Sequence, residues 1–350
     1  MMALAHGKHI YIEKPMCRTF HEAELMIAMA KRHPELVTQV GNQGHSEENY
    51  FQFKAWQNAG IIKDVTAVSA HMNLPRRWHK WDSNMQHMPL GDPLPKGMDW
   101  DTWLGARPWH AFANDYHQGQ WRCWYDFGMG CLGDWGAHIL DTVHEFLHLG
   151  LPYEIDLTYQ KGHNDFFYPY SSTILFRFAK RKGMPPCDIT WYDGLDNLPP
   201  LPKNYGTSEY NPNIPSTNDG ETPRVNLNPG KIIYSKDLIF KGGSHATPLT
   251  ILPSAKAEEI KKKLPEVPKS PSNHYLNFLL ACQGKEKTRS PFEINGVLSE
   301  VFCLGVIAQR LNARLQFDTE AKRFTNNEFA NSLLAGLPPR KGWEDFYKLL

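Results

Sequence analysis

The first 43 residues alternate between strand and helix patterns, and this alternation constrains the fold more than any other feature. Residues 9–13 have the β-branched and aromatic composition of a buried strand, an amphipathic helix is predicted at 21–33, and 35–42 forms a second strand pattern. Strands joined by a helix are typically parallel and belong to an α/β doubly wound sheet. Because such a sheet needs more strands than these two, we expect about 100 or more residues of nucleotide-binding fold upstream of Met1. Residues 1–43 would then be the remnant of that domain.

The pattern changes after this segment, and 44–350 is predicted to be an α+β domain. Short strand patterns bounded by turn residues predict a large, mostly antiparallel sheet. The fold class is therefore α/β plus α+β. The predicted helices and strands lie at the following positions: helices at 45–60, 133–150, 254–264, 270–284 and 294–313, and strands at 64–74, 153–160, 171–179, 187–193, 231–236 and 237–243.

Composition argues against several classes of partner. Lys and Arg number 38 against 37 Asp and Glu, so no field of one sign is predicted to attract nucleic acid or an anionic membrane. The cysteines are scattered and show no metal-ligand spacing, so no metal site is predicted. No apolar run approaches the ~20 residues that span a bilayer, and the start of the chain lacks a signal-peptide pattern. We expect a cytoplasmic protein, or an exported or periplasmic one if a signal preceded Met1.

Two motifs at a characteristic separation resemble those of a known family. Glu13-Lys14-Pro15 at the end of the first strand resembles the E-K-P motif of the glucose-fructose oxidoreductase and inositol dehydrogenase family (Gfo/Idh/MocA). Asp134 and His138 resemble the D-x-x-x-H segment of the same family. The resemblance covers essentially the whole chain. It implies a Rossmann domain followed by an α+β domain, a carbohydrate substrate, NAD or NADP as cofactor, and a homo-oligomer formed through the antiparallel sheet.

One part of the family pattern has no counterpart before the first strand. The resemblance places the G-x-G-x-x-G phosphate loop and the acidic residue that contacts the ribose upstream of Met1. Whether these 350 residues bind the dinucleotide on their own therefore stays open at this point.

The resemblance assigns the ends of the two parallel strands to the cofactor. Lys14 lies at a carboxyl strand end, where open α/β sheets place ligands, and Pro15 fixes the backbone there, with a cis bond as one option. The family's lysine contacts both cofactor and substrate. Glu13, Lys14, Pro15, Asn42 and Gln43 are thus the predicted cofactor-binding residues, while an ordinary strand end followed by a turn is the alternative.

The helix at 133–150 supplies the other predicted catalytic groups. Asp134, expected in its first turn, and His138 lie four residues apart and project from one helix face. A histidine can take a hydroxyl proton near neutral pH, while the aspartate orients substrate or base. With Lys14, these two are the predicted catalytic residues. Asp141 is a possible support for His138. The alternative is a capping aspartate and a core histidine.

The irregular stretch 75–127 is rich in tryptophan and in basic side chains, and loops of this length are usually functional. Stacking on sugar rings and hydrogen bonding to hydroxyls would suit these side chains, although most of the tryptophans are expected in the core. By resemblance, Arg122 is the predicted substrate contact, together with Trp121, Asp134 and His138. The tryptophans and their basic neighbours are Trp78, Trp81, Trp100, Trp103, Trp109, Trp121, Trp124, Arg76, Arg77, His79 and Arg122.

A literal G-x-G-x-x-G occurs at Gly128, Gly130 and Gly133. A dinucleotide fingerprint follows a β-strand in a βαβ unit, whereas an aromatic segment precedes this one and antiparallel strands follow it. We interpret it as a flexible loop that approaches substrate closely. Glu154, at about the expected distance, keeps the fingerprint as an alternative.

The predicted function is hydride transfer between a hydroxyl-bearing carbon of a sugar, polyol or glycoside and NAD(P). One alternative is an NAD-dependent glycosidase that oxidises a hydroxyl transiently and eliminates the glycoside. Another is a non-catalytic sugar-binding or assembly protein derived from the family.

Overall fold

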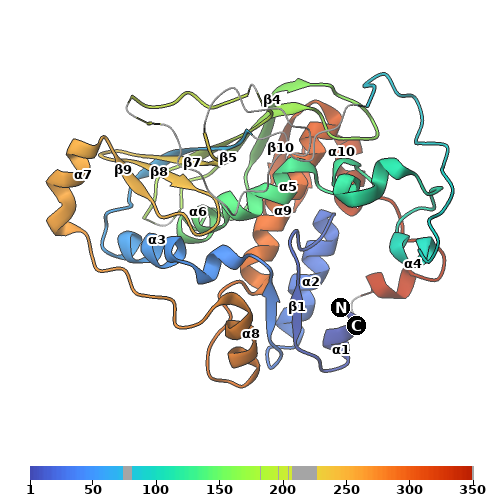
Figure 1. Ribbon diagram of the computed structural model, residues 1–350, viewed down its shortest axis with the longest axis horizontal. Helices are drawn as coiled ribbons and strands as arrows, with labels where there is room; N and C mark the ends of the chain where they lie inside the picture. Colours follow the sequence, from blue (N-terminus) through green and yellow to red (C-terminus); the bar gives the residue numbers. More distant parts are fainter. Residues whose placement is uncertain (74–80, 182, 196, 204, 207–226, 349–350) are drawn as a thin grey trace.

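A mostly antiparallel sheet forms the larger part of the fold (Figure 1). The computed structural model describes residues 1–73, 81–181, 183–195, 197–203, 205–206 and 227–348. Among these residues the sheet has nine strands, in the order β11-β10-β4-β5-β6-β3-β7-β8-β9. The predicted fold class is confirmed. The strands are β3 (Val65–Met72), β4 (Glu154–Lys161), β5 (Ser171–Phe178), β6 (Cys187–Asp193), β7 (Gly230–Ser235), β8 (Ile239–Gly243), β9 (Thr250–Leu252), β10 (Arg314–Asp318) and β11 (Arg323–Phe324).

Side-chain alternation explains how a strand such as β6 sits in this sheet. Ile189 and Trp191 are buried, whereas Thr190 between them is only partly covered. Its neighbour β3 runs parallel to it, with Val68 opposite Ile189, and pairs with β7 in the antiparallel direction. The sheet is therefore mixed at its centre.

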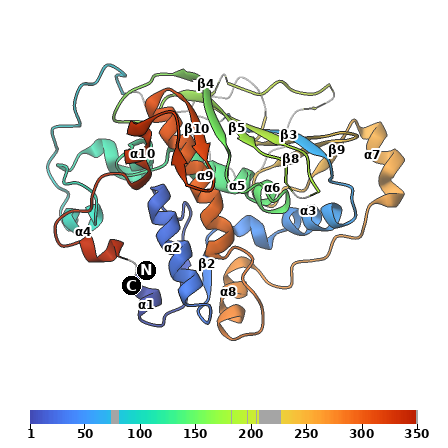
Figure 2. The same cartoon turned by 180° about the vertical axis from the view of Figure 1, so that it is seen from behind.

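Helices cover one face of the sheet and join it to the smaller N-terminal part. The helices are α1 (Met2–Ala5), α2 (Phe20–Arg32), α3 (Glu48–Asn58), α4 (Trp100–Leu104), α5 (Gly130–Ile139), α6 (Asp141–Phe146), α7 (Ser254–Ile260), α8 (His274–Cys282), α9 (Phe292–Leu311) and α10 (Glu328–Ala335), with 3₁₀ turns η1 (Gln43–Ser46), η2 (Asn114–Cys123), η3 (Lys261–Lys263) and η4 (Glu344–Tyr347). Figure 2 shows α9 between the sheet and α2, and α9 contacts α2, α5, β4 and β5.

Helix α9 is the central packing element of the molecule. Its side chains Leu298, Phe302 and Leu304 are buried in the main hydrophobic core. It is 20 residues long and apolar enough to cross a membrane by length and composition, and 78% of its apolar window is buried inside the protein. The helix predicted at 294–313 corresponds to α9, and its burial identifies this apolar segment as a core helix.

The N-terminal part contains a pair of parallel strands, β1 (Ile10–Ile12) and β2 (Thr38–Val40), connected through α2. Helix α2 begins with a capping box, in which the Thr19 hydroxyl accepts a hydrogen bond from the Glu22 backbone N–H and the Glu22 carboxylate accepts one from the Thr19 N–H. Ile12 lies opposite Val40, so the two strands end at the same edge. The residues that follow both strands are brought together there.

The predicted helix at 133–150 is in fact two helices. Helix α5 begins at Gly130, three residues early, and a break at Leu140 separates it from α6. Asp134 therefore lies in the second turn of α5, where it cannot cap the helix, contrary to the expected first-turn position. Strands β9, β10 and β11 were also not predicted.

Candidate functional site

Lys14 and Asp134 meet although they are 120 residues apart in sequence. The Lys14 ammonium donates hydrogen bonds to the Asp134 backbone carbonyl at 2.7 Å and to its Oδ1 at 2.8 Å. The side chain of Lys14 is 16% exposed and that of Asp134 is 5% exposed. Contacts of this kind are stronger where water is largely excluded. The end of β1 is thereby joined to the second turn of α5.

Arg122 brings a second cation to the same carboxylate. Its Nε lies 3.5 Å from Asp134 Oδ1, and its guanidinium carbon lies 4.4 Å from the centre of the Trp121 ring. Lys14, Arg122 and Asp134 together carry a net charge of +1, and we call these three residues the lysine cluster. A net positive charge favours an oxygen that gains negative charge during a reaction.

His138 lies one turn beyond Asp134 on α5 and is 6% exposed. Its ring stacks on that of His245, with centroids 3.9 Å apart and planes inclined by 19°. The His245 backbone N–H also donates to the His138 carbonyl at 3.1 Å. His245 lies just after β8, and nothing in the sequence pointed to it, because only the pairing of distant strands brings it to α5.

The end of β2 also reaches α5. The Asn42 amide donates to the Ala137 carbonyl at 3.1 Å, and Asn42 itself is buried. The Lys14–Pro15 peptide bond is cis, and Gln43 opens the 3₁₀ turn η1. Both strand ends are thus held against the helix that carries Asp134 and His138.

Glu13 is exposed and lies over Gly41, the first residue after β2. A Cβ added at Gly41 would lie 2.6 Å from the Glu13 Oε2, so a larger residue would displace this carboxylate. Glycine at this position therefore lets Glu13 approach the end of the neighbouring strand.

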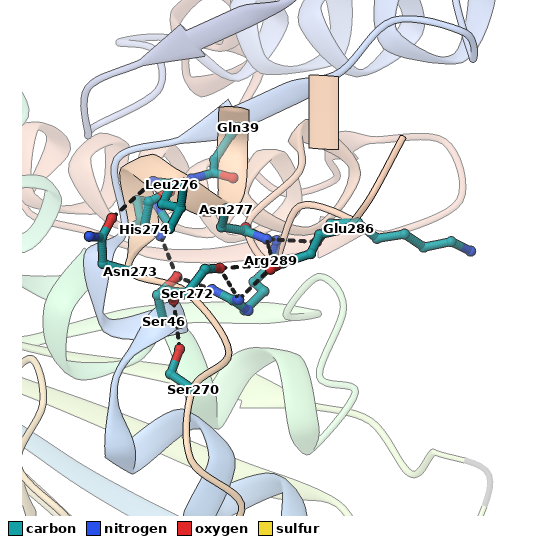
Figure 3. Close-up of polar contacts among 11 residues, drawn as sticks. Gln39, Ser46, Ser270, Ser272, Asn273, His274, Leu276, Asn277, Glu286 and Arg289 are labelled. Atoms are coloured by element: carbon teal, nitrogen blue, oxygen red, sulfur yellow. Dashed lines mark hydrogen bonds and ion pairs between the residues drawn. The ribbon is translucent and has the colours of Figure 1, made fainter. Parts of the chain in front are cut away.

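A partly buried polar network contacts the Val40 carbonyl, at the end of β2 (Figure 3). We define the strand-end network as Ser46, Ser272, His274, Glu286 and Arg289. His274 Nε2 lies 2.9 Å from the Val40 carbonyl, which can only accept, so this nitrogen carries the proton and Nδ1 accepts from the Ser46 hydroxyl at 2.9 Å. Arg289 donates to Ser46 Oγ at 2.7 Å and to Glu286 Oε2 at 2.9 Å. Burial lowers the pKa of His274 to about 4.

Asp141, the residue suggested to support His138, contacts His45. Its Oδ1 accepts from the Thr142 N–H at 2.7 Å, and its Oδ2 lies 3.6 Å from His45 Nε2. Burial lowers the pKa of Lys231 to about 8, and Asp141 opposes that shift. Asp141 thus belongs to a buried polar group behind α5, and its suggested support of His138 stays a prediction.

The glycines of the G-x-G-x-x-G segment serve close packing. Gly130 and Gly133 lie inside α5, and a Cβ added at Gly128 would lie 2.4 Å from the Arg122 Cα. The 3₁₀ turn η2 precedes the segment in place of a β-strand. Glu154 forms ion pairs with Arg177 and Arg314 at the sheet surface. These contacts favour the interpretation that the segment is not a dinucleotide fingerprint, and its helical part is not a flexible loop.

The tryptophan-rich stretch is divided between core and surface. Trp124 is fully buried and Trp100 is nearly so, whereas Trp109 is 67% exposed. Trp121, which contacts Arg122, is partly buried. Four further members of this stretch, Arg76, Arg77, Trp78 and His79, lie outside the described residues.

Comparison with known proteins identifies a match over the centre of the chain. Residues 61–181 match the C-terminal alpha/beta domain of an oxidoreductase family, Gfo/Idh/MocA. No curated protein sequence matches the chain.

Solved structures share the fold at low sequence identity. The chain is similar to an NAD-binding protein from Listeria innocua, with TM-score 0.52 and 13% identity over 90% of this chain and 76% of that one. It is also similar to an aldose-aldose oxidoreductase from Caulobacter crescentus complexed with glycerol, with TM-score 0.50 and 13% identity over 90% and 74%. A third is a protein provisionally named an NADPH-dependent oxidoreductase, from Desulfitobacterium hafniense, with TM-score 0.51 and 11% identity over 90% and 74%.

Proposed function

Because the chain belongs to the Gfo/Idh/MocA oxidoreductase family, we propose that it transfers hydride between a hydroxyl-bearing carbon of a sugar, polyol or glycoside and NAD or NADP. The observation that carries this proposal is the 2.8 Å contact between Lys14 Nζ and Asp134 Oδ1. It joins the two sequence motifs at one place, at the carboxyl end of a parallel strand, where α/β folds bind their ligands.

Lys14 is suited to hold the reacting hydroxyl. Its ammonium is fixed by the side chain and the backbone carbonyl of Asp134, so its position is set before substrate arrives. A positive charge at this point stabilises the alkoxide character that develops on the hydroxyl oxygen. Arg122 adds a second positive charge on the other side of Asp134. Asp134 is thus the residue that positions both cations.

His138 is suited to accept the hydroxyl proton. An imidazole exchanges a proton near neutral pH, and helix α5 projects His138 from the same face as Asp134. His245 fixes the plane of the His138 ring by stacking on it. The proton would therefore pass to a base whose orientation is set by a second ring.

The residues at the two strand ends fit the nicotinamide end of the cofactor. Ammonium and amide groups from Lys14, Asn42 and Gln43 match the carboxamide and ribose hydroxyls of a nicotinamide nucleotide, and Glu13 and Pro15 border the same edge. When bound, the nicotinamide ring supplies the hydride acceptor. The NAD-binding relative of similar fold supports this choice of cofactor, and the aldose-aldose oxidoreductase supports a carbohydrate substrate.

The test is a survey of sugars, polyols and nitrophenyl glycosides with NAD and NADP, measured by nicotinamide absorbance and by product analysis. We expect reduction of one cofactor with at least one substrate. Lys14→Met should lower kcat/KM by about 10²- to 10⁴-fold. The exposed Lys8→Met serves as the matched control and should leave the rate unchanged.

The other outcomes identify the alternatives. Glycoside cleavage without net cofactor reduction would show the eliminative glycosidase. Saturable sugar binding without any change in NAD(H) fluorescence would show a binding protein and would refute the oxidoreductase proposal.

A further inference from the structure

A cavity lies apart from the lysine cluster, between the start of α2, the segment at 125–126, α9 and α10. Its volume is about 250 Å³. Its polar lining residues are Arg18, Thr19, Tyr125, Asp126, Arg310 and Ser332. Lys14, Arg122 and Asp134 do not line it. We call it the α9–α10 cavity. Its chemistry is therefore separate from the proposed oxidoreductase site.

Two buried donors on its wall have no hydrogen-bond partner among the described residues. These are Arg18 Nε and the Tyr125 hydroxyl. The Arg18 side chain is held by another nitrogen, Nη1, which donates to the Tyr125 carbonyl at 3.1 Å. Burial raises the pKa of Tyr125, so its hydroxyl stays protonated and able to donate. Buried donors are normally paired, so these two are available to an acceptor that binds at this cavity.

Arg310 adds a positive charge to the same wall. Its guanidinium carbon lies 5.3 Å from the centre of the Tyr125 ring. No ion pair to this guanidinium is found within the described part of the chain. Asp126, the acidic residue of the wall, is already bound to His110 Nε2 at 2.9 Å.

The charges around the cavity sum to one positive charge. Glu22 pairs with Arg107, so these two charges cancel. The two arginines of the wall, Arg18 and Arg310, are then opposed by one carboxylate, that of Asp126. A single surplus charge matches a monoanion better than a dianion such as phosphate. The charged groups are Arg18, Arg107 and Arg310 against Glu22 and Asp126.

The rest of the lining is apolar. Val306, Ile307 and Leu333 face the cavity, and Phe329 and Leu337 in the lining are 64% and 55% exposed. A ligand with an apolar body would cover these side chains while its anionic end met the donors.

We propose that the α9–α10 cavity binds a small monocarboxylate with an apolar body. The carboxylate accepts hydrogen bonds from Arg18 Nε and the Tyr125 hydroxyl and faces Arg310. The apolar body lies against α9 and α10. Arg18 follows Lys14 by only four residues. The proposed carboxylate site and the lysine cluster are therefore close in sequence, although they share no residue.

Calorimetric titration of the full chain with benzoate, benzamide and acetate tests this proposal. We expect benzoate to bind, and neutral benzamide and the smaller acetate each to bind at least 10-fold more weakly. Arg310→Gln and Tyr125→Phe should each weaken benzoate binding by at least 10-fold. Arg323→Gln, an exposed arginine outside the cavity lining, should leave it unchanged.

Tyr125→Phe keeps the fold testable, because the hydroxyl that it removes bonds to no described residue. Its melting temperature should equal that of the wild type. The proposal is overturned if benzoate and benzamide bind equally, if neither variant alters benzoate binding, or if benzoate does not bind at millimolar concentration, which would leave water as the acceptor.

Discussion

The lysine cluster and the strand-end network lie at the same edge of the β1–β2 pair but are built differently. In the lysine cluster two cations share one carboxylate, and the side chains of Lys14 and Arg122 remain 16% and 28% exposed. In the strand-end network Arg289 is balanced by Glu286, and His274 is neutral and bonded through both ring nitrogens. We interpret the first arrangement, in which two cations contact one carboxylate, as a reactive site, and the second, in which an ion pair and a neutral histidine are bonded to each other's neighbours, as a structural one.

The largest effect after that of Lys14→Met is also on activity, from a change at the helix that carries Asp134. His138→Gln removes the proposed proton acceptor while keeping a polar side chain of similar size. We expect kcat to fall by about 10²- to 10³-fold. In the oxidation direction the acidic limb of the pH–rate profile should change, because a base acts only when deprotonated, and the melting temperature should shift little. His21→Gln, at an exposed position on α2, is the control. An unchanged kcat would remove His138 from the mechanism.

The two motifs show how much of the site the sequence could predict. The resemblance assigns Lys14 and Asp134 to one site, because E-K-P ends a strand and D-x-x-x-H has the family spacing. Their direct contact, at 2.8 Å, is seen only in the structure. That Lys14, Asp134 and His138 act in catalysis stays a prediction. The stacked His245 could not be predicted, because its position depends on the pairing of β7 with β8 and on the left-handed backbone of His245, with φ of 51°.

The fold shows the same division between local and long-range information. The strand pattern of β6 and the amphipathic pattern of α2 are local, and the sequence predicts both elements. The parallel pairing of β3 with β6 depends on contacts between segments more than 100 residues apart. The break at Leu140 was also missed, because no proline or glycine occupies that position. Short strands such as β11 bury too few residues to leave a pattern.

The next expected effect is on stability, from a change in the strand-end network. Arg289→Ala removes donors to Ser46, Ser272 and Glu286, and we expect a loss of about 2–4 kcal/mol in the free energy of unfolding. The rate per folded molecule should stay near that of the wild type. Chemical denaturation and active-site titration measure the two quantities. Arg323→Ala, at an exposed ion pair, should cost at most about 1 kcal/mol.

A different result for Arg289→Ala would break the comparison. If kcat fell as far as in His138→Gln while stability was unchanged, the strand-end network would have to be counted as part of the reactive site.

The smallest expected effect is the pH dependence of stability that His274 contributes. Its pKa is about 4 in the folded protein and 6.5 in the unfolded reference, so the unfolded chain binds the proton more readily. The free energy of unfolding that neutral His274 contributes is fully present above pH 6.5 and is lost as the pH falls from 6.5 toward 4. At pH 5.5 the loss is about 1 kcal/mol.

His274→Gln should abolish this pH-dependent part, because a glutamine amide can accept from Ser46 and donate to the Val40 carbonyl without titrating. Denaturation curves of both proteins at pH 7 and 5.5 measure it. His71 and His144, whose pKa values burial also lowers to about 4, contribute equally to both proteins and cancel in the difference. If the free energy of unfolding fell by the same amount between pH 7 and 5.5 in both proteins, His274 would accept its proton without disturbing the strand-end network. The contrast between a reactive and a structural cluster would then depend on the activity measurements alone.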